Sequence, residues 1–284
     1  CHSPRVVEGV QHKKVSRLKE FDVARRQHQR LTQCPLCRTL VWTHPVTGRF
    51  LEPLSVSRCP ICQLEFLNPR MTADEYRTFY ETTYRTIVKP TEEILGRAQR
   101  SSQHLGHKIA DWVKRVIPER PAGPLLDIGC GDGIVGATIA RDLGQPIIGL
   151  DPNPQDCQQA QEQGIDIQEG SFESLPLNAT IPYPHQETFA GILCIRTFDH
   201  VLEPIQGLRK LVKRLVPGGW MWIDILETTK NRERFGPVGF WKIDHPFYWT
   251  EQTLQQALMC TGWRILDKGY AGKTLYGVIC QPKG

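Results

Sequence analysis

The chain has 284 residues, of which 40% are hydrophobic and 23% charged, so it has the composition of an ordinary globular protein with room for one large domain or two smaller ones. Residues 1–33 hold eight basic and three acidic side chains and therefore carry the whole formal net charge of +5. No apolar run reaches the ~20 residues of a membrane-spanning helix and no secretory signal is recognisable. We therefore expect a cytoplasmic protein without a membrane partner.

The first predicted segments are a basic leader over residues 1–30 and a metal-binding ribbon over residues 31–70. Four of the ten cysteines stand in two C-x-x-C pairs, Cys34 with Cys37 and Cys59 with Cys62, separated by 21 residues. Two such pairs can place four thiolates tetrahedrally around one zinc ion. The ribbon is too short to build a core of its own, so we expect a structural zinc that supplies folding energy and takes no part in catalysis.

A helical segment ending in a linker is expected over residues 71–118. Thr72, followed three residues later by Glu75, has the spacing of a helix-capping box. The helical pattern is broken near Pro90, and residues 118–124 lead into the first strand of the next domain.

From residue 119 to residue 284, strand patterns alternate with helical patterns. The predicted strands cover residues 125–128, 147–151, 165–169, 188–195, 219–226, 263–270 and 274–281, and the predicted helices cover residues 134–143, 154–163, 204–215 and 251–261. This alternation predicts an α/β fold with a Rossmann-like, doubly wound, mostly parallel seven-stranded sheet, preceded by the zinc ribbon and the helical segment.

The most informative stretch is the glycine-rich turn after the first of these strands, with the sequence Leu-Leu-Asp-Ile-Gly-Cys-Gly-Asp-Gly at residues 125–133. Such a turn lets the backbone approach a ligand closely, and Asp151 at the end of the next strand can accept both hydroxyls of a ribose. The sixth position of the dinucleotide fingerprint is Ile134 instead of glycine, which weighs against NAD and FAD. Asp127 suits a ligand with a positive amino group, such as the methionine end of S-adenosylmethionine.

These residues resemble motif I of the class I S-adenosylmethionine-dependent methyltransferases. Later segments resemble further parts of that family in the same order: residues 170–176, 189–195, 199–204 and 215–220. The resemblance covers roughly residues 95–282 and implies that the last strand runs antiparallel. It implies S-adenosylmethionine as the cofactor, bound by Asp127, Gly129, Cys130, Gly131, Gly133, Asp151, Pro152, Ser171, Phe172, Ile195, Arg196 and Tyr84.

Two histidines are candidate general bases, because methyl transfer often requires removal of a proton from the acceptor. His200 follows the fourth strand, and His245 stands beside Asp244 in a long insertion at residues 227–250. Each has packing or capping as its alternative role. The insertion is rich in aromatic residues, which either form a lid over the substrate or pack into the core. By resemblance, Tyr80 and Tyr84 are expected to close over the methionine end of the cofactor.

The acceptor is left open by the sequence. A zinc ribbon joined to this domain resembles methyltransferases of sugar and natural-product pathways, including deoxysugar C-methyltransferases, which implies a small-molecule acceptor. The alternative is an RNA base methyltransferase, since some ribosomal-RNA enzymes also carry an N-terminal zinc module; the basic leader favours RNA, whereas the charge-balanced body does not. A third alternative is a cofactor-binding scaffold without activity. The acceptor atom and the oligomeric state are not predicted.

Overall fold

The computed structural model describes residues 22–40, 53–84, 92–172, 188–239 and 242–284. Its centre is a seven-stranded sheet with the strand order β11-β12-β9-β8-β5-β6-β7. The strands are β5 (Leu125–Ile128), β6 (Ile147–Asp151), β7 (Asp166–Glu169), β8 (Phe189–Cys194), β9 (Leu215–Leu226), β11 (Trp263–Tyr270) and β12 (Leu275–Pro282). All seven predicted strands are therefore present, with bounds shifted by a few residues.

The sheet is mostly parallel, as predicted. β5 pairs in parallel with both β6 and β8, and the parallel pairing extends to β7 on one side and β9 on the other. β12 runs antiparallel to β9 and to β11, as the family resemblance implied. Because β5 lies between β6 and β8, the chain reverses its direction of winding there, and this is where ligands bind in open α/β sheets.

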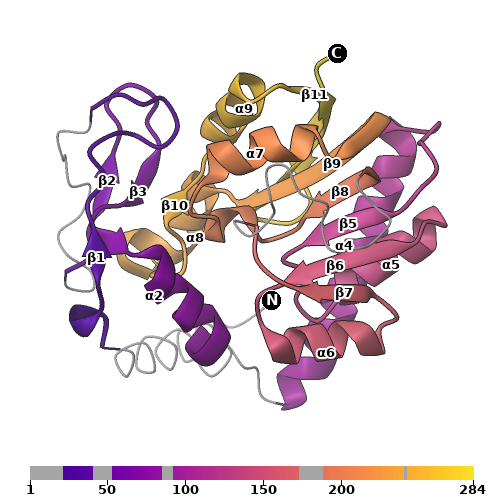
Figure 1. Cartoon of the computed structure of the whole chain (residues 1–284), viewed down its shortest axis with the longest axis horizontal. Helices are drawn as coiled ribbons and strands as arrows, with labels where there is room; N and C mark the ends of the chain where they lie inside the picture. Colours follow the sequence, from indigo (N-terminus) through magenta and orange to yellow (C-terminus); the bar gives the residue numbers. More distant parts are fainter. Residues whose placement is uncertain (1–21, 41–52, 85–91, 173–187, 240–241) are drawn as a thin grey trace.

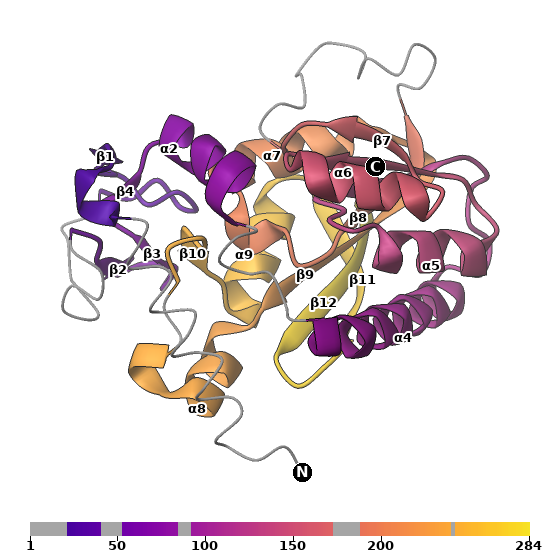
Figure 2. The same ribbon diagram turned by 90° about the horizontal axis from the view of Figure 1, so that it is seen from below.

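Helices cover both faces of the sheet. One face packs on α4 (Glu92–Val116), α5 (Ile134–Leu143) and α6 (Pro154–Glu162), and the other on α7 (Pro204–Val212) and α9 (Glu251–Cys260). Figure 2 shows α4 and α5 side by side at the lower right, on one side of the sheet. Neighbouring residues of β5 illustrate the division: Leu125 belongs to the cluster with α4 and α5, and Leu126 to the cluster with α7 and α9.

Residues 22–40 and 53–84, which we call the N-terminal module, lie together at the left of Figure 1. The module contains η1 (Val23–Arg25), α2 (Ala73–Thr78) and a π-helical turn, η2 (Phe79–Thr83). Its strands β1 (His28–Gln29) and β4 (Arg70–Met71) pair with each other. β2 (Val56–Arg58) and β3 (Glu65–Leu67) form a sheet with a third strand, β10 (Phe247–Tyr248), which comes from the long insertion.

The start of this module differs from the expected boundary at residue 31. Val23 is only 2% exposed, and β1 pairs with β4, so residues 22–30 pack with the module; residues 1–21 of the expected leader lie outside the described residues. The Thr72 cap is present as predicted, since its side chain accepts a hydrogen bond of 3.4 Å from the Glu75 N–H. The expected break near Pro90 lies outside the described residues.

The insertion at residues 227–250 is more regular than a lid loop. It contains α8 (Thr228–Gly239), interrupted at Gly236, and the strand β10. Phe247, Tyr248 and Trp249 are at most 2% exposed, because β10 is buried between β3 and the rest of the molecule. These three aromatics are therefore core residues, whereas Phe240 and Trp241 lie outside the described residues. Within the described part of the chain, no helix is both long and apolar enough to cross a membrane.

Candidate active site

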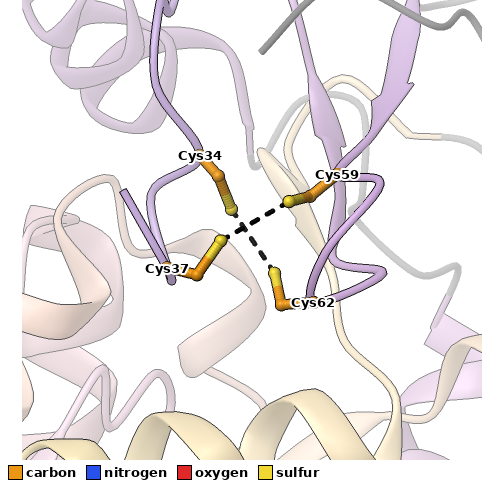
Figure 3. A group of neighbouring side chains, drawn as sticks. All are labelled: Cys34, Cys37, Cys59 and Cys62. Carbon is orange, nitrogen blue, oxygen red and sulfur yellow. Dashed lines mark hydrogen bonds between the residues drawn. The ribbon is translucent and has the colours of Figure 1, made fainter. Parts of the chain in front are cut away.

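The four paired cysteines converge in the N-terminal module. The Sγ atoms of Cys34 and Cys62 are 3.5 Å apart, as are those of Cys37 and Cys59, and all four lie within 4.8 Å of one another. Figure 3 shows the four thiols pointing toward a common centre. A tetrahedron of sulfurs around zinc has edges of about 3.8 Å, since the Zn–S distance is about 2.3 Å. The arrangement therefore fits a four-cysteine zinc site with no open position.

The chemistry of the thiols also suits a metal. The hydrogen bond between Cys34 and Cys62 lowers the pKa of the Cys34 thiol and raises that of Cys62, so without a metal these two sulfurs share one proton. Zinc would bind all four sulfurs as thiolates. The two C-x-x-C turns face different surroundings: Leu36 in the first is buried against the core beside α7 and α9, and Ile61 in the second is exposed. The first turn thus fixes the metal site to the main domain.

The glycine-rich turn after β5 is shaped for close approach. Gly129, Gly131 and Gly133 all have positive φ values of 58–76°, the left-handed region that favours glycine. The N–H of Gly129 donates to the Leu150 carbonyl at 2.7 Å, which fixes the turn to the end of β6. A Cβ on Gly129 would lie 2.4 Å from the Thr197 hydroxyl, so this position has no room for a side chain.

Asp151, at the end of β6, is held with its carboxylate at the turn. It accepts hydrogen bonds of 2.9 Å from the Gly131 N–H and from the Asn153 N–H, and it is 7% exposed. Each carboxylate oxygen can accept more than one hydrogen bond, so these backbone bonds orient the group without preventing it from binding ribose hydroxyls. The carboxylate therefore lies at the glycine turn, and its binding of a ribose stays a prediction.

A cavity of about 160 Å³ opens beside this turn. Eight of the predicted cofactor residues line it: Gly129, Gly131, Asp151, Pro152, Ser171, Phe172, Arg196 and Tyr84. Four do not: Asp127, Cys130, Gly133 and Ile195. The cavity is thus assembled from the ends of β5, β6 and β8 and from the N-terminal module. Residues 173–176 of the loop expected beside the adenine lie outside the described residues.

The four predicted residues that do not line the cavity lie behind it. Gly133 is the N-cap residue just before α5, and a Cβ there would lie 2.7 Å from Ile165 and 3.0 Å from Ala160, so its small size serves packing. Burial raises the pKa of the Cys130 thiol well above its usual value, which makes it an inert thiol. Ile195 is 8% exposed at the end of β8.

Asp127 is the exceptional member of this group, because it is a buried carboxyl with an unsatisfied atom. It is 2% exposed, and its Oδ1 has no hydrogen-bond partner among the described residues. Burial, together with the nearby carboxyls of Asp151 and Asp224, raises its pKa to about 8. A nearby cation would stabilise the charged form of this carboxyl, and its role toward the amino group stays a prediction.

Three cavity residues were missed by the sequence analysis: Asn153, Asp156 and Thr197. Asn153 caps α6 by accepting from the Gln155 and Asp156 N–H groups at 3.1 Å, and its side-chain amide donates to the Tyr80 carbonyl at 3.1 Å. The dipeptide Asn153-Pro154 is a helix-start signal at the end of β6 and could have located it. Thr197 has no comparable local signal.

His200 lies on the wall of the cavity, and its ring is held by two partners. Its Nδ1 is 2.7 Å from the Asp244 carbonyl oxygen and 2.9 Å from the Tyr80 hydroxyl. A carbonyl only accepts hydrogen bonds, so Nδ1 carries the proton, and Nε2 then has the lone pair. Nε2 makes no hydrogen bond with the described residues. Burial lowers the pKa of His200, against the opposing effect of Asp244, so the ring is neutral near pH 7.

His245 is brought next to His200 but does not line the cavity. The two rings are perpendicular with centroids 4.5 Å apart, and His245 Nε2 is 3.9 Å from the Asp244 carboxylate. The side chain of His245 is 7% exposed, compared with 20% for that of His200. Of the two predicted bases, His200 faces the cavity and His245 packs behind it.

The comparisons with known proteins agree with this geometry. Residues 100–268, more than half of the chain, match a family described as a methyltransferase domain. Over 118 residues the chain is 34% identical to a ubiquinone biosynthesis O-methyltransferase of Parvibaculum lavamentivorans, covering 40% of this chain and 44% of that one. A protein of the same name from Caulobacter vibrioides is 31% identical over 40% of this chain and 45% of that one. The chain spans about half the length of the curated relatives it matches.

Solved structures show the same fold at low sequence identity. A plantazolicin methyltransferase in complex with a substrate analogue and S-adenosylhomocysteine superposes with a TM-score of 0.54 at 14% identity, over 74% of this chain and 97% of that one. A magnesium protoporphyrin IX methyltransferase from Synechocystis, with S-adenosylmethionine bound, gives 0.52 at 13% identity over 74% and 96%. With the family match over residues 100–268, these findings establish that the chain belongs to the methyltransferase domain family, with the Rossmann-like fold of class I S-adenosylmethionine-dependent members.

Proposed function

We propose that the protein transfers a methyl group from S-adenosylmethionine to a small-molecule acceptor and that His200 removes the acceptor proton. The observation that carries this proposal is the setting of His200. It stands on the wall of the cavity that contains the glycine turn and Asp151, with Nδ1 held by a backbone carbonyl and Nε2 unpaired among the described residues. A neutral imidazole in this tautomer is ready to accept a proton.

The cofactor is assigned to the cavity beside the glycine turn. Asp151 would bind the ribose hydroxyls and Phe172 would pack against the adenine, since both residues line the cavity. Asp127 does not line the cavity, so its buried carboxyl would act on the amino group only indirectly. Tyr84 and Arg196 line the same cavity and would bind the methionine end. When bound, S-adenosylmethionine supplies an electrophilic methyl group on a sulfonium centre.

His200 Nε2 would take the acceptor proton as the new bond to the methyl carbon forms. The lowered pKa keeps the His200 ring neutral near pH 7, so Nε2 does not have to lose a proton before it can act as a base. The Asp244 carbonyl fixes the tautomer, and the imidazolium formed by proton transfer is stabilised by the Asp244 carboxylate, 4.0 Å from Nδ1. In this proposal His245, the second predicted base, supports the ring of His200 from behind.

A small acceptor is favoured over RNA by the charge around the cavity. Asp151 and Asp156 line it with a single described cation, Arg196, and a polyanion would meet these carboxylates. Curated relatives are named as ubiquinone biosynthesis O-methyltransferases, and the two solved neighbours are named for plantazolicin and magnesium protoporphyrin IX. These names support a small organic acceptor, and we propose that it is an intermediate of sugar or natural-product metabolism. The four cysteines are proposed to hold a structural zinc.

The first test is calorimetry with S-adenosylhomocysteine. Binding to the wild type and loss of binding in Asp151→Ala are expected, whereas absence of binding by the wild type would refute the enzyme proposal and favour an inactive scaffold. Acceptors are then screened with radiolabelled S-adenosylmethionine, comparing the wild type with His200→Gln. The expected variant binds the cofactor normally and transfers the methyl group about 100-fold or more slowly, as removal of a general base predicts.

RNA methylation is kept as the alternative because residues 1–33 carry the whole net charge of +5. RNA binding that weakens steeply with salt and disappears on deletion of residues 1–33 would favour it. Weak RNA binding that responds neither to salt nor to deletion of residues 1–33 would exclude RNA methylation.

A further inference from the structure

Residues 242–249, which we call the strap, bring Asp244 to His200 and are held by the N-terminal module. The Tyr76 hydroxyl donates to the Ile243 carbonyl at 2.9 Å, and the Leu67 N–H donates to the Pro246 carbonyl at 2.9 Å. Within the strap, β10 pairs with β3, so that Phe247 faces Phe66. The carbonyl that fixes the His200 tautomer is therefore bracketed, one residue before and two residues after, by hydrogen bonds from the module.

The four-cysteine site determines the position of β3. Cys59 and Cys62 form the turn between β2 and β3, in which the Cys59 N–H donates to the Leu64 carbonyl at 2.9 Å. β3 begins three residues after Cys62. A module of this size has a small core, and in such modules the metal supplies much of the folding energy. Loss of the metal would therefore release the strand against which β10 pairs.

Tyr80 makes a second connection from the module to His200. Its hydroxyl is 3.0 Å from the Asp244 carbonyl and 2.9 Å from His200 Nδ1. The hydroxyl donates to the carbonyl, and its oxygen shares the proton on Nδ1 with that carbonyl. Tyr80 lies in the π-helical turn η2, a local geometry that is frequently found at functional sites. Tyr80 thus connects the module, the strap and the base.

We infer that the N-terminal metal module is a positioning element of the methyl-transfer site: with metal bound at the four cysteines, the strap and Tyr80 keep the His200 proton on Nδ1 and leave Nε2 available as the base. This inference rests on the proposed function, in which His200 is the base. It goes beyond a structural role for zinc, because it assigns the metal a specific effect on one side chain outside its own module.

The inference predicts that cofactor binding and the tautomer of His200 respond differently to removal of the metal. Gly129, Gly131 and Asp151 belong to the turn and strand ends of the central sheet, and their hydrogen bonds are made within that sheet. They do not depend on the strap. Removal of the metal is therefore expected to leave cofactor binding largely intact while His200 populates both neutral tautomers. Some weakening is expected because Tyr80 and Tyr84 line the same cavity.

The test follows the ring nitrogens of His200 by NMR in the full chain with ¹⁵N-labelled histidine. Long-range ¹H–¹⁵N spectra distinguish a protonated from an unprotonated ring nitrogen, and His200→Gln identifies the signal among the nine histidines. The metal-loaded wild type is expected to show the proton on Nδ1. After removal of the metal with a chelator, averaged signals of two tautomers are expected, with the Kd for S-adenosylhomocysteine raised by less than about threefold.

A second variant covers the case in which chelation unfolds more than the module. Tyr80→Phe keeps the ring and the metal site but removes the hydroxyl, and it is expected to shift the His200 tautomer signals in the same direction. The matched control is Tyr276→Phe, which removes a hydroxyl that accepts a hydrogen bond from the Gln255 amide at 2.8 Å, a bond that involves neither the module nor the strap. Its His200 signals should equal those of the wild type.

Three results would overturn the inference. His200 could keep the Nδ1 tautomer after metal removal, Tyr80→Phe could be indistinguishable from Tyr276→Phe, or chelation could abolish cofactor binding, which would show that the metal stabilises the whole fold. Failure of the proposed function is recognised separately, because the wild type would then not bind S-adenosylhomocysteine at all.

Discussion

Replacement of Gly129 by alanine tests whether the turn after β5 is shaped by its own backbone and by contact with Thr197. With φ of 68°, any side chain costs roughly 1–2 kcal/mol in backbone strain. The added Cβ would also lie 2.4 Å from Thr197 Oγ1 and 2.6 Å from its Cγ2, and overpacking of this kind costs about 1–3 kcal/mol. The free energy of unfolding should therefore fall by about 2–5 kcal/mol, and S-adenosylhomocysteine binding should be lost.

Two further variants separate the cost of backbone strain from the cost of the clash with Thr197. Gly144→Ala has nearly the same φ, 66°, with nothing within 4 Å of its Cβ, so it should show the backbone cost alone and bind the cofactor normally. Thr197→Ala removes both atoms that clash and leaves the nearest Thr197 atom, its Cβ, 3.1 Å away, so the double variant should recover about 1–2 kcal/mol of the loss. The measurement is urea unfolding followed by tryptophan fluorescence, with calorimetry for binding. Equal destabilisation by Gly129→Ala and Gly144→Ala would refute the packing argument.

Three further predictions follow from the same site. Burial raises the pKa of Asp127 to about 8, against about 3.9 in an unfolded chain, so the folded state keeps a proton that the unfolded state releases, and this group lowers stability as the pH rises between these values. The free energy of unfolding, measured with urea, should therefore fall by about 1 kcal/mol per pH unit between about pH 5.5 and 7.5. Asp127→Asn should remove this fall, whereas the exposed Asp166→Asn should not. If the wild type and Asp127→Asn gave parallel pH profiles, Asp127 would be charged in the folded protein. Gly207→Ala places a Cβ 1.5 Å from the ring of Phe172, so it should destabilise the protein by about 1–3 kcal/mol and weaken cofactor binding measured by calorimetry. Because burial lowers the pKa of His200 below 6.5, kcat/KM for methyl transfer should already be at its plateau by about pH 7; an acidic limb centred above about pH 7 would contradict the assignment of the base.

The parts of the fold that the sequence predicts well are those with a regular local pattern. The apolar strands and the helices of residues 119–284 follow the periodicity of their side chains, and strand pairing follows from their alternation. The glycine turn could be predicted because a positive φ favours glycine, and the three glycines are visible in the sequence. The four cysteines were predictable for a similar reason, since metal geometry dictates their spacing.

The sequence analysis did not predict the contact between the insertion at residues 227–250 and the N-terminal module. β10 has two residues, which is too short for a periodic pattern, and its partner β3 lies about 180 positions earlier in the chain. An aromatic run such as Phe247, Tyr248 and Trp249 shows that a large surface is buried but not against which partner. The hydrogen bond from His200 to the Asp244 carbonyl involves the backbone of Asp244, so the residue type at position 244 does not indicate it.

The late position of β10 in the chain has a consequence for synthesis on the ribosome. The cysteines and β3 are made first, and the strand that completes their sheet, β10, is made only about 180 residues later. Until then β3 presents an unpaired edge, which is open to pairing with other chains. Early capture of the metal would limit this exposure by holding the two C-x-x-C turns together while translation continues. The same order means that a version truncated before residue 247 would contain every cysteine ligand and still lack a complete ribbon.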